Sequence, residues 1–175
     1  EKQISYPNKT KAISISRVDF DKHTDIIIDA NDKLKTKSKQ VHIYGALSDL
    51  YVYHKLRDTN FKLYYKGKFG KSFKDLIDLL YPCKFMIDMS AIKGDGGGSQ
   101  YTFLEAIYMR CILVLNSKWT DNVKTDFKHN HNCLIVDNSD DLYKLLKKGI
   151  TEKEFKRITT NAYSLLKSHI KGNGW

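Results

Sequence analysis

The sequence predicts an α/β fold, a Rossmann-like, doubly wound parallel sheet of about six strands with helices on both faces. Three observations lead to this prediction. Short runs rich in Ile, Val, Tyr and Phe alternate along the chain with longer segments of helical period. Several short runs are apolar at consecutive positions, as expected of strands covered on both faces. Regular alternation of strand and helix is typical of a parallel sheet with right-handed crossovers.

The expected strands are short, and the segments between them are long enough for helices. The six strands are expected at residues 11–16, 40–45, 62–67, 84–90, 111–116 and 132–137. The helices are expected at residues 22–35, 47–58, 72–80, 99–109, 139–148 and 151–169. Residues 117–131 have the least regular pattern, and we expect a loop with a short helix there.

Two of the expected helices begin with clear capping signals. Ser139 precedes Asp140 and Asp141, and Thr151 precedes Glu152 and a second glutamate two residues later. A hydroxyl can accept from the free N–H groups of the first turn, and the helix dipole favours acids there. We therefore expect Ser139 and Thr151 to cap these helices.

Residues 1–175 are expected to form one domain, because the chain has the length of a single domain and no Pro/Gly-rich linker interrupts it. The sequence does not begin with Met, so we expect this domain to belong to a longer protein. There is no apolar run of 18 residues, and no transmembrane segment is expected. Three cysteines without Cys-x-x-Cys spacing argue against a disulfide framework and a zinc site, which favours a reducing, cytoplasmic location.

The chain is basic, with 30 Lys and Arg residues against 20 Asp and Glu residues and a net charge of +10. Such a charge permits a polyanionic partner. The lysines are scattered among acids rather than gathered in one block, which favours a solvated surface over a nucleic-acid interface. A nucleic-acid-binding α/β module stays open as an alternative function.

A glycine-rich segment, GDGGGS at residues 94–99, follows the fourth expected strand and opens the next helix. Glycines let a ligand approach the main chain, and the free N–H groups of the first helical turn can donate to an anion. The segment therefore predicts a phosphate site. The alternative is an ordinary loop with a cap at Ser99. The pattern is neither a Walker A motif nor the dinucleotide fingerprint.

Glu105 lies almost two turns into that helix, between Leu104 and Ala106. A carboxylate in apolar surroundings needs a partner, because its desolvation is costly. The vicinal diol of a ribose can donate two hydrogen bonds to a carboxylate and is a suitable partner. A glutamate on a solvated stripe is the alternative.

Arg17 and Lys22 follow the first expected strand and so belong to the same edge of the sheet. An Arg fork and a Lys ammonium at this spacing can hold a diphosphate. Since loss of a diphosphate leaving group develops negative charge, cations fixed there would stabilise the transition state.

Taken together, these motifs resemble one family. SRVDFDKHTDIIIDA is similar to the Ser-Arg-x-Asp-x-x-Lys-(Gly) opening of the donor-binding, C-terminal domain of GT-B glycosyltransferases of the "glycosyl transferases group 1" type. DGGGSQYTFLEA is similar to the loop and helix that carry the Glu-x7-Glu signature of that family. VHIYG, YYKGKF, LIDLLYPCKFMIDMS and HNHNCLIVDNSDDLYKLL follow in the family's order. The resemblance covers residues 11–165 and implies one half of a GT-B fold.

The resemblance also implies roles for particular residues. Arg17 and Lys22 match the cations that bind the diphosphate, and Glu105 matches the glutamate that holds the ribose. The turn Gly67, Lys68 and Phe69 matches the one whose main chain meets the base. The residues expected to face the phosphate through their N–H groups are Gly96, Gly97, Gly98, Ser99, Gln100, Tyr101 and Thr102.

One position departs from the family. Gly97 stands where the first signature glutamate belongs, and the nearest acid is Asp95. Either Asp95 takes that role, as a catalytic residue together with Arg17 and Lys22, or the role is missing. An epimerase or a non-catalytic nucleotide-sugar-binding domain therefore stays open.

The family implies transfer of a sugar from a UDP- or GDP-linked donor to an acceptor hydroxyl. It further implies retention of configuration, no metal and no cofactor other than the donor, and an N-terminal acceptor-binding domain that this chain does not contain.

Other candidates have more ordinary interpretations. His129 and His131 are two apart, but no acid or thiol is spaced to complete a metal site. Asp88 is expected to be a buried residue that hydrogen-bonds to a neighbouring loop. Trp119 either borders the sugar or covers the sheet.

Overall fold

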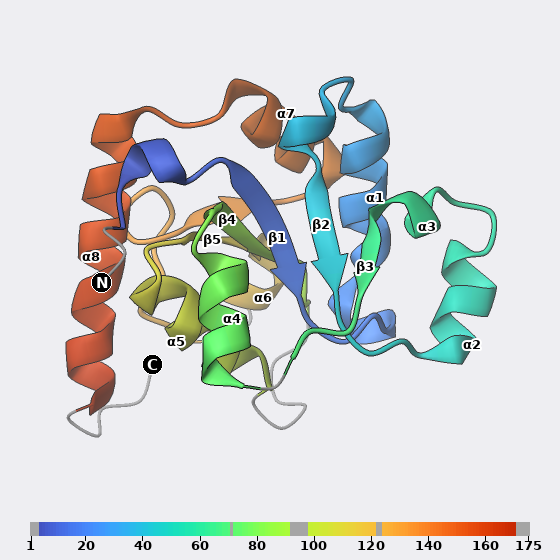
Figure 1. The fold of residues 1–175 in the computed structure, drawn as a ribbon, viewed down its shortest axis with the longest axis horizontal. Coiled ribbons are helices and arrows are strands. Elements are labelled where there is room, and N and C mark those ends of the chain that lie inside the picture. Colours follow the sequence, from blue (N-terminus) through green and yellow to red (C-terminus); the bar gives the residue numbers. More distant parts are fainter. Residues whose placement is uncertain (1–3, 71, 92–97, 122–123, 171–175) are drawn as a thin grey trace.

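The computed structural model describes residues 4–70, 72–91, 98–121 and 124–170. Six parallel strands form one sheet in the order β3-β2-β1-β4-β5-β6, with helices on both faces (Figure 1). The strands are β1 (Lys11–Ile15), β2 (Val41–Tyr44), β3 (Tyr65–Gly67), β4 (Cys83–Asp88), β5 (Ile112–Asn116) and β6 (Leu134–Val136). The predicted doubly wound fold is confirmed.

The chain builds the sheet outwards from β1 in two directions. It first adds β2 and β3 on one side, and then crosses back to place β4, β5 and β6 on the other. The reversal lies between β1 and β4, which pair in parallel. In open α/β sheets this switch point is where ligands bind, outside the carboxyl ends of the strands.

Helices and turns connect all of the strands. The helices are α1 (Thr24–Lys33), α2 (Asp49–Tyr51), the π-helical turn η4 (Val52–Leu56), α3 (Phe61–Tyr64), α4 (Phe73–Leu80), α5 (Gly98–Tyr108), α6 (Ser117–Asp121), α7 (Ser139–Lys148) and α8 (Glu152–Ile170). The 3-10 turns are η1 (Tyr6–Asn8), η2 (Phe20–Lys22) and η3 (Lys37–Lys39).

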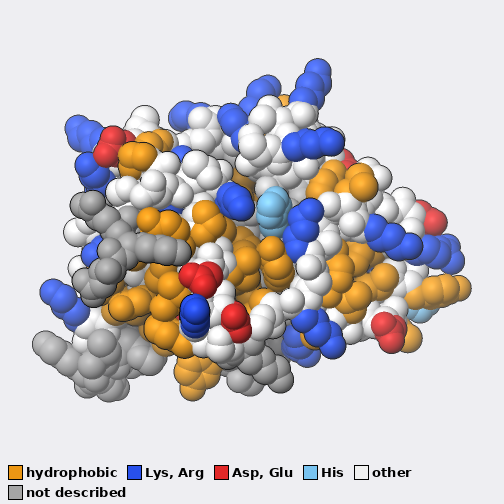
Figure 2. Space-filling view, in the orientation of Figure 1, with side chains coloured by type: hydrophobic (Ala, Val, Ile, Leu, Met, Phe, Trp, Pro, Cys, Tyr) orange, Lys and Arg blue, Asp and Glu red, His pale blue; other side chains and the backbone are white. Residues whose placement is uncertain are grey.

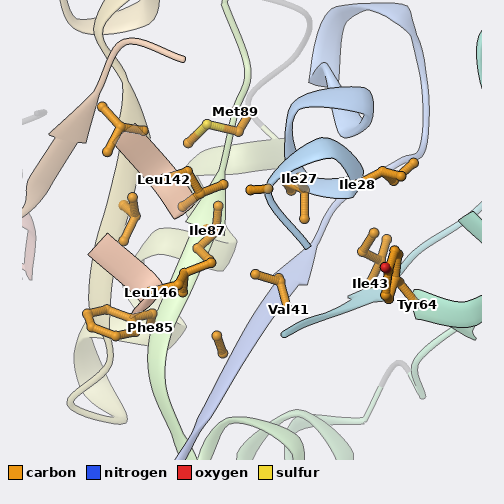
Figure 3. Close-up of a cluster of buried hydrophobic side chains, with 14 of the residues drawn as sticks. Ile27, Ile28, Val41, Ile43, Tyr64, Phe85, Ile87, Met89, Leu142 and Leu146 are labelled. Carbon is orange, nitrogen blue, oxygen red and sulfur yellow. The ribbon is translucent and has the colours of Figure 1, made fainter. Parts of the chain in front are cut away.

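Two apolar clusters hold the layers together, one on each face of the sheet. On the first face α1 and α7 pack against the strands, and Figure 3 shows this cluster. Its labelled members are Ile27, Ile28, Val41, Ile43, Tyr64, Phe85, Ile87, Met89, Leu142 and Leu146. On the other face the strands pack against α4, α5 and α8. Each fully buried aliphatic side chain contributes about 1.5–3 kcal/mol, so these layers dominate stability.

The third predicted strand is partly wrong. Only Tyr65–Gly67 is a strand, and the residues before it form α3. Phe61 and Tyr64 are both buried, and a spacing of three places them on one side of a helix but on opposite faces of a strand. Burial of both rings in the first cluster therefore favours the helix.

The two predicted caps have different outcomes. The Thr151 hydroxyl accepts from the N–H of Glu154, as predicted. For α7 the N-cap is Asn138, whose side chain accepts from the N–H of Asp141 (3.0 Å), and Ser139 is the first helical residue. Because Asn138 provides the cap, the Ser139 hydroxyl is not needed there. It instead donates a hydrogen bond to Asp29 of α1.

Lys9 is a buried cation at the amino edge of the sheet, with only 1% of its surface exposed. Its ammonium donates to the carbonyl oxygens of Leu80 (3.2 Å) and Met109 (2.5 Å), at the carboxyl ends of α4 and α5. Burial lowers the pKa of Lys9. The charged ammonium is stabilised in the interior because it donates to unpaired carbonyls at the carboxyl ends of two helices, where the helix dipoles are negative.

We predict that Lys9→Met destabilises the domain by about 2–4 kcal/mol, because it removes the ammonium donor from two buried carbonyls. Urea unfolding measures this change. Lys35→Met, at an exposed lysine, is the control and should stay within about 0.5 kcal/mol of the parent. Equal effects of the two substitutions would contradict the capping role.

Candidate functional site

The segments that follow β1 and β4 lie together at the carboxyl edge of the sheet. The two strands are adjacent and parallel. Beyond them, the N–H of Ala91 donates to the carbonyl oxygen of Asp21 (3.4 Å). The predicted cations after β1 therefore belong to the same edge as the chain that leads into α5.

The cations Arg17 and Lys22 converge on one oxygen. Asp21 Oδ2 lies 3.5 Å from the Arg17 guanidinium and 3.4 Å from Lys22 Nζ. Arg17 also lies 3.6 Å from Asp19. Two cations that share one carboxylate oxygen have the spacing needed to share an oxygen of a bound anion.

The two cations differ in their surroundings. The side chain of Arg17 is 55% exposed, whereas that of Lys22 is only 5% exposed. A buried ammonium is costly unless anionic groups are near it. The sequence motif contains both cations. It does not indicate that Lys22 is buried, or that Asp21 forms ion pairs with both Arg17 and Lys22.

The loop that carries these cations is held by local contacts. Asp19 caps the turn η2 by accepting from the N–H of Phe20 (2.8 Å). The Phe20 ring packs edge-on against Tyr51, at 5.0 Å between centroids. His23 then starts α1 in a left-handed conformation, with φ of 47°. The family motif has Gly at this position, which adopts that conformation without strain.

Gly45 allows the end of β1 to approach the end of β2. A Cβ at Gly45 would lie 1.7 Å from the carbonyl oxygen of Ser16. The N–H of Gly45 donates to the carbonyl oxygen of Gly67 (3.0 Å), which joins the turn after β3 to the same region. Within that turn Lys68 is exposed, and Phe69 packs against the apolar cluster under α4, α5 and α8.

Glu105 is half-buried on α5, beside the buried residues Phe103 and Ala106. Burial raises the pKa of its carboxyl group above the usual range. Within the described residues, no hydrogen bond or ion pair of this carboxylate is found. A ligand that donates hydrogen bonds to this carboxylate would therefore offset the cost of its burial. Earlier on the same helix, Tyr101 is exposed and Thr102 is half-buried.

The other residues predicted to meet the phosphate are only partly described. Gly98, Ser99 and Gln100 are the first residues of α5. Asp95, Gly96 and Gly97 lie outside the described residues.

Asp88 and Ser90 are two buried polar residues near this edge that do not belong to the cation or glycine motifs. Both are buried at the end of β4, and the Ser90 N–H donates to Asp88 Oδ1 (2.9 Å). Among the described residues, Asp88 Oδ2 and the Ser90 hydroxyl have no hydrogen-bond partner. Asp88 is thus buried and bonded to the following loop, as expected. Unpaired polar atoms of this kind are rare away from functional regions.

The remaining candidates are structural. Trp119 is buried and packs edge-on against Phe103 (5.8 Å between centroids), so it covers the sheet. His129 Nδ1 accepts from the N–H of Ile135 (2.9 Å). Among the described residues, no group of three or more His, Cys, Asp or Glu side chains is arranged to hold a metal ion.

Cys83, Cys111 and Cys133 are buried free thiols. None of the helices in the described ranges is long and apolar enough to cross a membrane.

Comparison with known proteins identifies the fold. No protein-family model matches the sequence, and no curated protein has significant sequence similarity to it. Solved structures do match. Anabaena HepE, in complex with UDP and glucose, has a TM-score of 0.69 at 17% identity, over 95% of this chain and 46% of HepE. The chain thus spans less than half of that protein.

Two shorter structures are covered almost completely. The C-terminal domain of LpcC, a glycosyl transferase group 1 family protein from Francisella tularensis, matches with a TM-score of 0.67 at 16% identity, over 93% of this chain and 87% of that domain. The catalytic domain of a Helicobacter pylori cholesterol-alpha-glucosyltransferase matches with a TM-score of 0.64 at 16% identity, over 92% and 99%. The predicted resemblance to GT-B glycosyltransferases is confirmed at the level of the fold.

We predict that Glu105→Gln raises the melting temperature of the ligand-free domain at pH 7 by about 1–2 °C. The raised pKa means that ionised Glu105 is less stable in the folded protein than in the unfolded chain. This cost is absent below the unfolded pKa of about 4.3 and develops as the pH rises through the higher folded pKa. The gain from Gln should therefore shrink as the pH falls towards 4.5.

Scanning calorimetry at several pH values measures this gain. Glu152→Gln is the matched control, because Glu152 is exposed in the first turn of α8 and pairs with Lys156. Its melting temperature should be unchanged or slightly lower. A melting temperature of Glu105→Gln below that of the parent at pH 7 would contradict the prediction.

Proposed function

We propose that this chain, which has the fold of the C-terminal domain of GT-B glycosyltransferases, is the donor-binding domain of such an enzyme. It binds a UDP- or GDP-linked sugar at the carboxyl edge of the sheet. The sugar is then transferred to an acceptor hydroxyl. HepE, which shares the fold, has been solved with UDP and glucose.

The observation that carries this proposal is the convergence of Arg17 and Lys22 on one Asp21 oxygen, beside the chain that enters α5. In the proposed complex, diphosphate oxygens take the place of the carboxylate oxygen between the two cations. The first N–H groups of α5 point at the same anion, as at other helix N-termini.

The chemistry follows from where charge develops. As the bond between the sugar and the diphosphate breaks, negative charge grows on the departing diphosphate. Arg17, Lys22 and the N–H groups of α5 are fixed before the reaction, so they stabilise that charge without reorganising. In this proposal they supply the positive charge that other transferases take from a metal ion. The resemblance favours retention of the anomeric configuration.

In this proposal the nucleoside lies on one side of the diphosphate and the sugar on the other. Glu105 accepts from the ribose hydroxyls, which is the partner its half-buried carboxylate requires. The main chain of the turn Gly67, Lys68 and Phe69 meets the base. Asp95 is proposed to take the part of the absent first glutamate near the sugar.

An additional domain is part of the proposal. The chain spans less than half of HepE and 33% of TarM. We propose that an N-terminal acceptor-binding domain completes the enzyme and that its closure excludes water from the activated sugar. The isolated chain should therefore bind donor weakly and turn it over slowly.

We predict that UDP or GDP raises the melting temperature of this domain by about 5 °C or more at about 100 times its Kd. Arg17→Ala should remove most of the shift, because it deletes one of the two cations. Glu105→Gln should also reduce it, through loss of the ribose contact. Differential scanning fluorimetry with each nucleoside diphosphate measures the shift.

Arg57→Ala serves as the matched control, since Arg57 is exposed and pairs with its neighbour Asp58. It should leave the shift unchanged. Full shifts in both Arg17→Ala and Glu105→Gln would refute the site. Salt-dependent binding of mixed-sequence DNA that Arg17→Ala does not alter would favour a nucleic-acid-binding module instead.

A further inference from the structure

One face of β2 and β3 is covered by no helix of the described residues. Val41 and Ile43 of β2 point into the cluster beneath α1, so His42 and Tyr44 point to the opposite side. The helices α4, α5 and α8 on that side pack against β1, β4 and β5. In Figure 1 no helix crosses in front of β2 and β3. His42 and Tyr44 are accordingly half-buried rather than covered.

Three basic side chains lie on this open side, one from each of three neighbouring strands. They are Lys11 of β1, His42 of β2 and Lys66 of β3. Figure 2 shows a histidine between Lys or Arg side chains over these strands. Like charges on neighbouring strands repel one another. An anion bound among these side chains would reduce that repulsion.

The charges lie close enough to affect one another. Burial lowers the pKa of His42, and the charges of Lys66 and Lys11 lower it further. An anion bound between these groups would act in the opposite direction, because it favours the protonated imidazole. Binding and protonation of His42 would then strengthen each other.

Space for a ligand lies on both sides of His42. A cavity of about 330 Å³ is lined by Lys37, Gln40, His42, Leu63, Tyr64 and Lys66. A smaller one, of about 100 Å³, lies between His42, Tyr44 and Lys11, with Asp78 of α4 also in its wall. A third cation, Lys37, thus faces the larger cavity beside Lys66 and His42.

The lysines around these cavities have no carboxylate partner. Within the described ranges, no ion pair joins Lys11, Lys37 or Lys66 to an acid. Lys33 of α1, by contrast, pairs with Asp29 (2.8 Å) and with Asp140 of α7 (2.7 Å). Lysines on the open face are therefore available to a ligand from solution.

We propose that Lys11, Lys37, His42 and Lys66 form a second anion-binding site, which takes a phosphate or phosphodiester group. The site is separate from the proposed donor site. Lys11 is the first residue of β1, at the amino edge, whereas Arg17 follows the carboxyl end of the same strand. The proposal does not depend on the function proposed above.

The site is expected to strengthen as the pH falls from 8 to 5. Histidine is the side chain whose ordinary pKa lies in this interval, and protonation of His42 adds a positive charge to the site. The other ionisable groups that face it are Lys11, Lys37, Tyr44, Tyr64, Lys66 and Asp78. Lys, Tyr and Asp side chains ordinarily titrate outside this interval, so we expect the pH dependence to follow the imidazole.

The test is an NMR titration of the His42 imidazole, assigned with His42→Gln, in sulfate and in chloride at equal ionic strength. Sulfate is the probe because its charge is constant between pH 5 and 8. It should raise the pKa of His42 by at least about 0.5 relative to chloride. Dimethyl phosphate, tested in parallel, represents a phosphodiester. A larger effect of dimethyl phosphate than of sulfate assigns the site to a phosphodiester, and the reverse assigns it to a terminal phosphate.

Lys66→Gln and Lys11→Gln should each reduce the sulfate effect at least about threefold. Lys153→Gln removes the same charge from an exposed position on α8 and should leave the effect unchanged. The proposal would be overturned if neither sulfate nor dimethyl phosphate raised the pKa of His42 above its value in chloride. Equal losses in Lys66→Gln and Lys153→Gln would also overturn it, since they would show general screening rather than a site. Arg17→Ala should have no influence, which separates this result from a failure of the donor site.

Discussion

The parallel pairing of β1 with β4 is the interaction on which the rest of the candidate site depends. The two strands are distant in the sequence, and the chain reverses its direction of sheet growth between them. Pairing in parallel places both carboxyl ends at one edge. The cation-bearing turn after β1 then meets the residues that follow β4, as the contact from Ala91 to Asp21 shows. The apolar layers on both faces make this pairing stable.

Several residues near that edge are in arrangements that reduce stability. Lys22 is buried, Glu105 is half-buried without a partner among the described residues, and His23 has a left-handed backbone. Asp88 Oδ2 and the Ser90 hydroxyl are buried and have no partner in the part of the chain that the structure describes. Local departures from the best packing gather where proteins bind ligands, because pre-arranged polar groups then need not reorganise. The well-packed core around α1 and α7 has no such departures among its apolar side chains.

The positive charge of the chain is used in more than one way. Lys9 caps two helix ends from inside the protein, and Lys33 ties α1 to α7. Arg17 and Lys22 share an acid at the carboxyl edge. Lys11, Lys37 and Lys66 line cavities on either side of His42 and form no ion pair within the described ranges. The basic residues of the chain thus have structural roles and, in the two proposed sites, binding roles as well.

The sequence by itself determined the order of strands and helices, most of their bounds, and the pairing of Arg17 with Lys22 in one motif. Periodicity and glycine placement are local properties, and the two faces of each element follow from them. The tertiary structure decided the remainder. Phe61 and Tyr64 form a helix because both rings are buried in one cluster. Lys22 is buried, Asp21 joins the two cations, and His42 lies on a face that no helix covers. The burial of a side chain and its interaction partners depend on residues far away in the sequence. The spacing of residues within one segment therefore does not predict them.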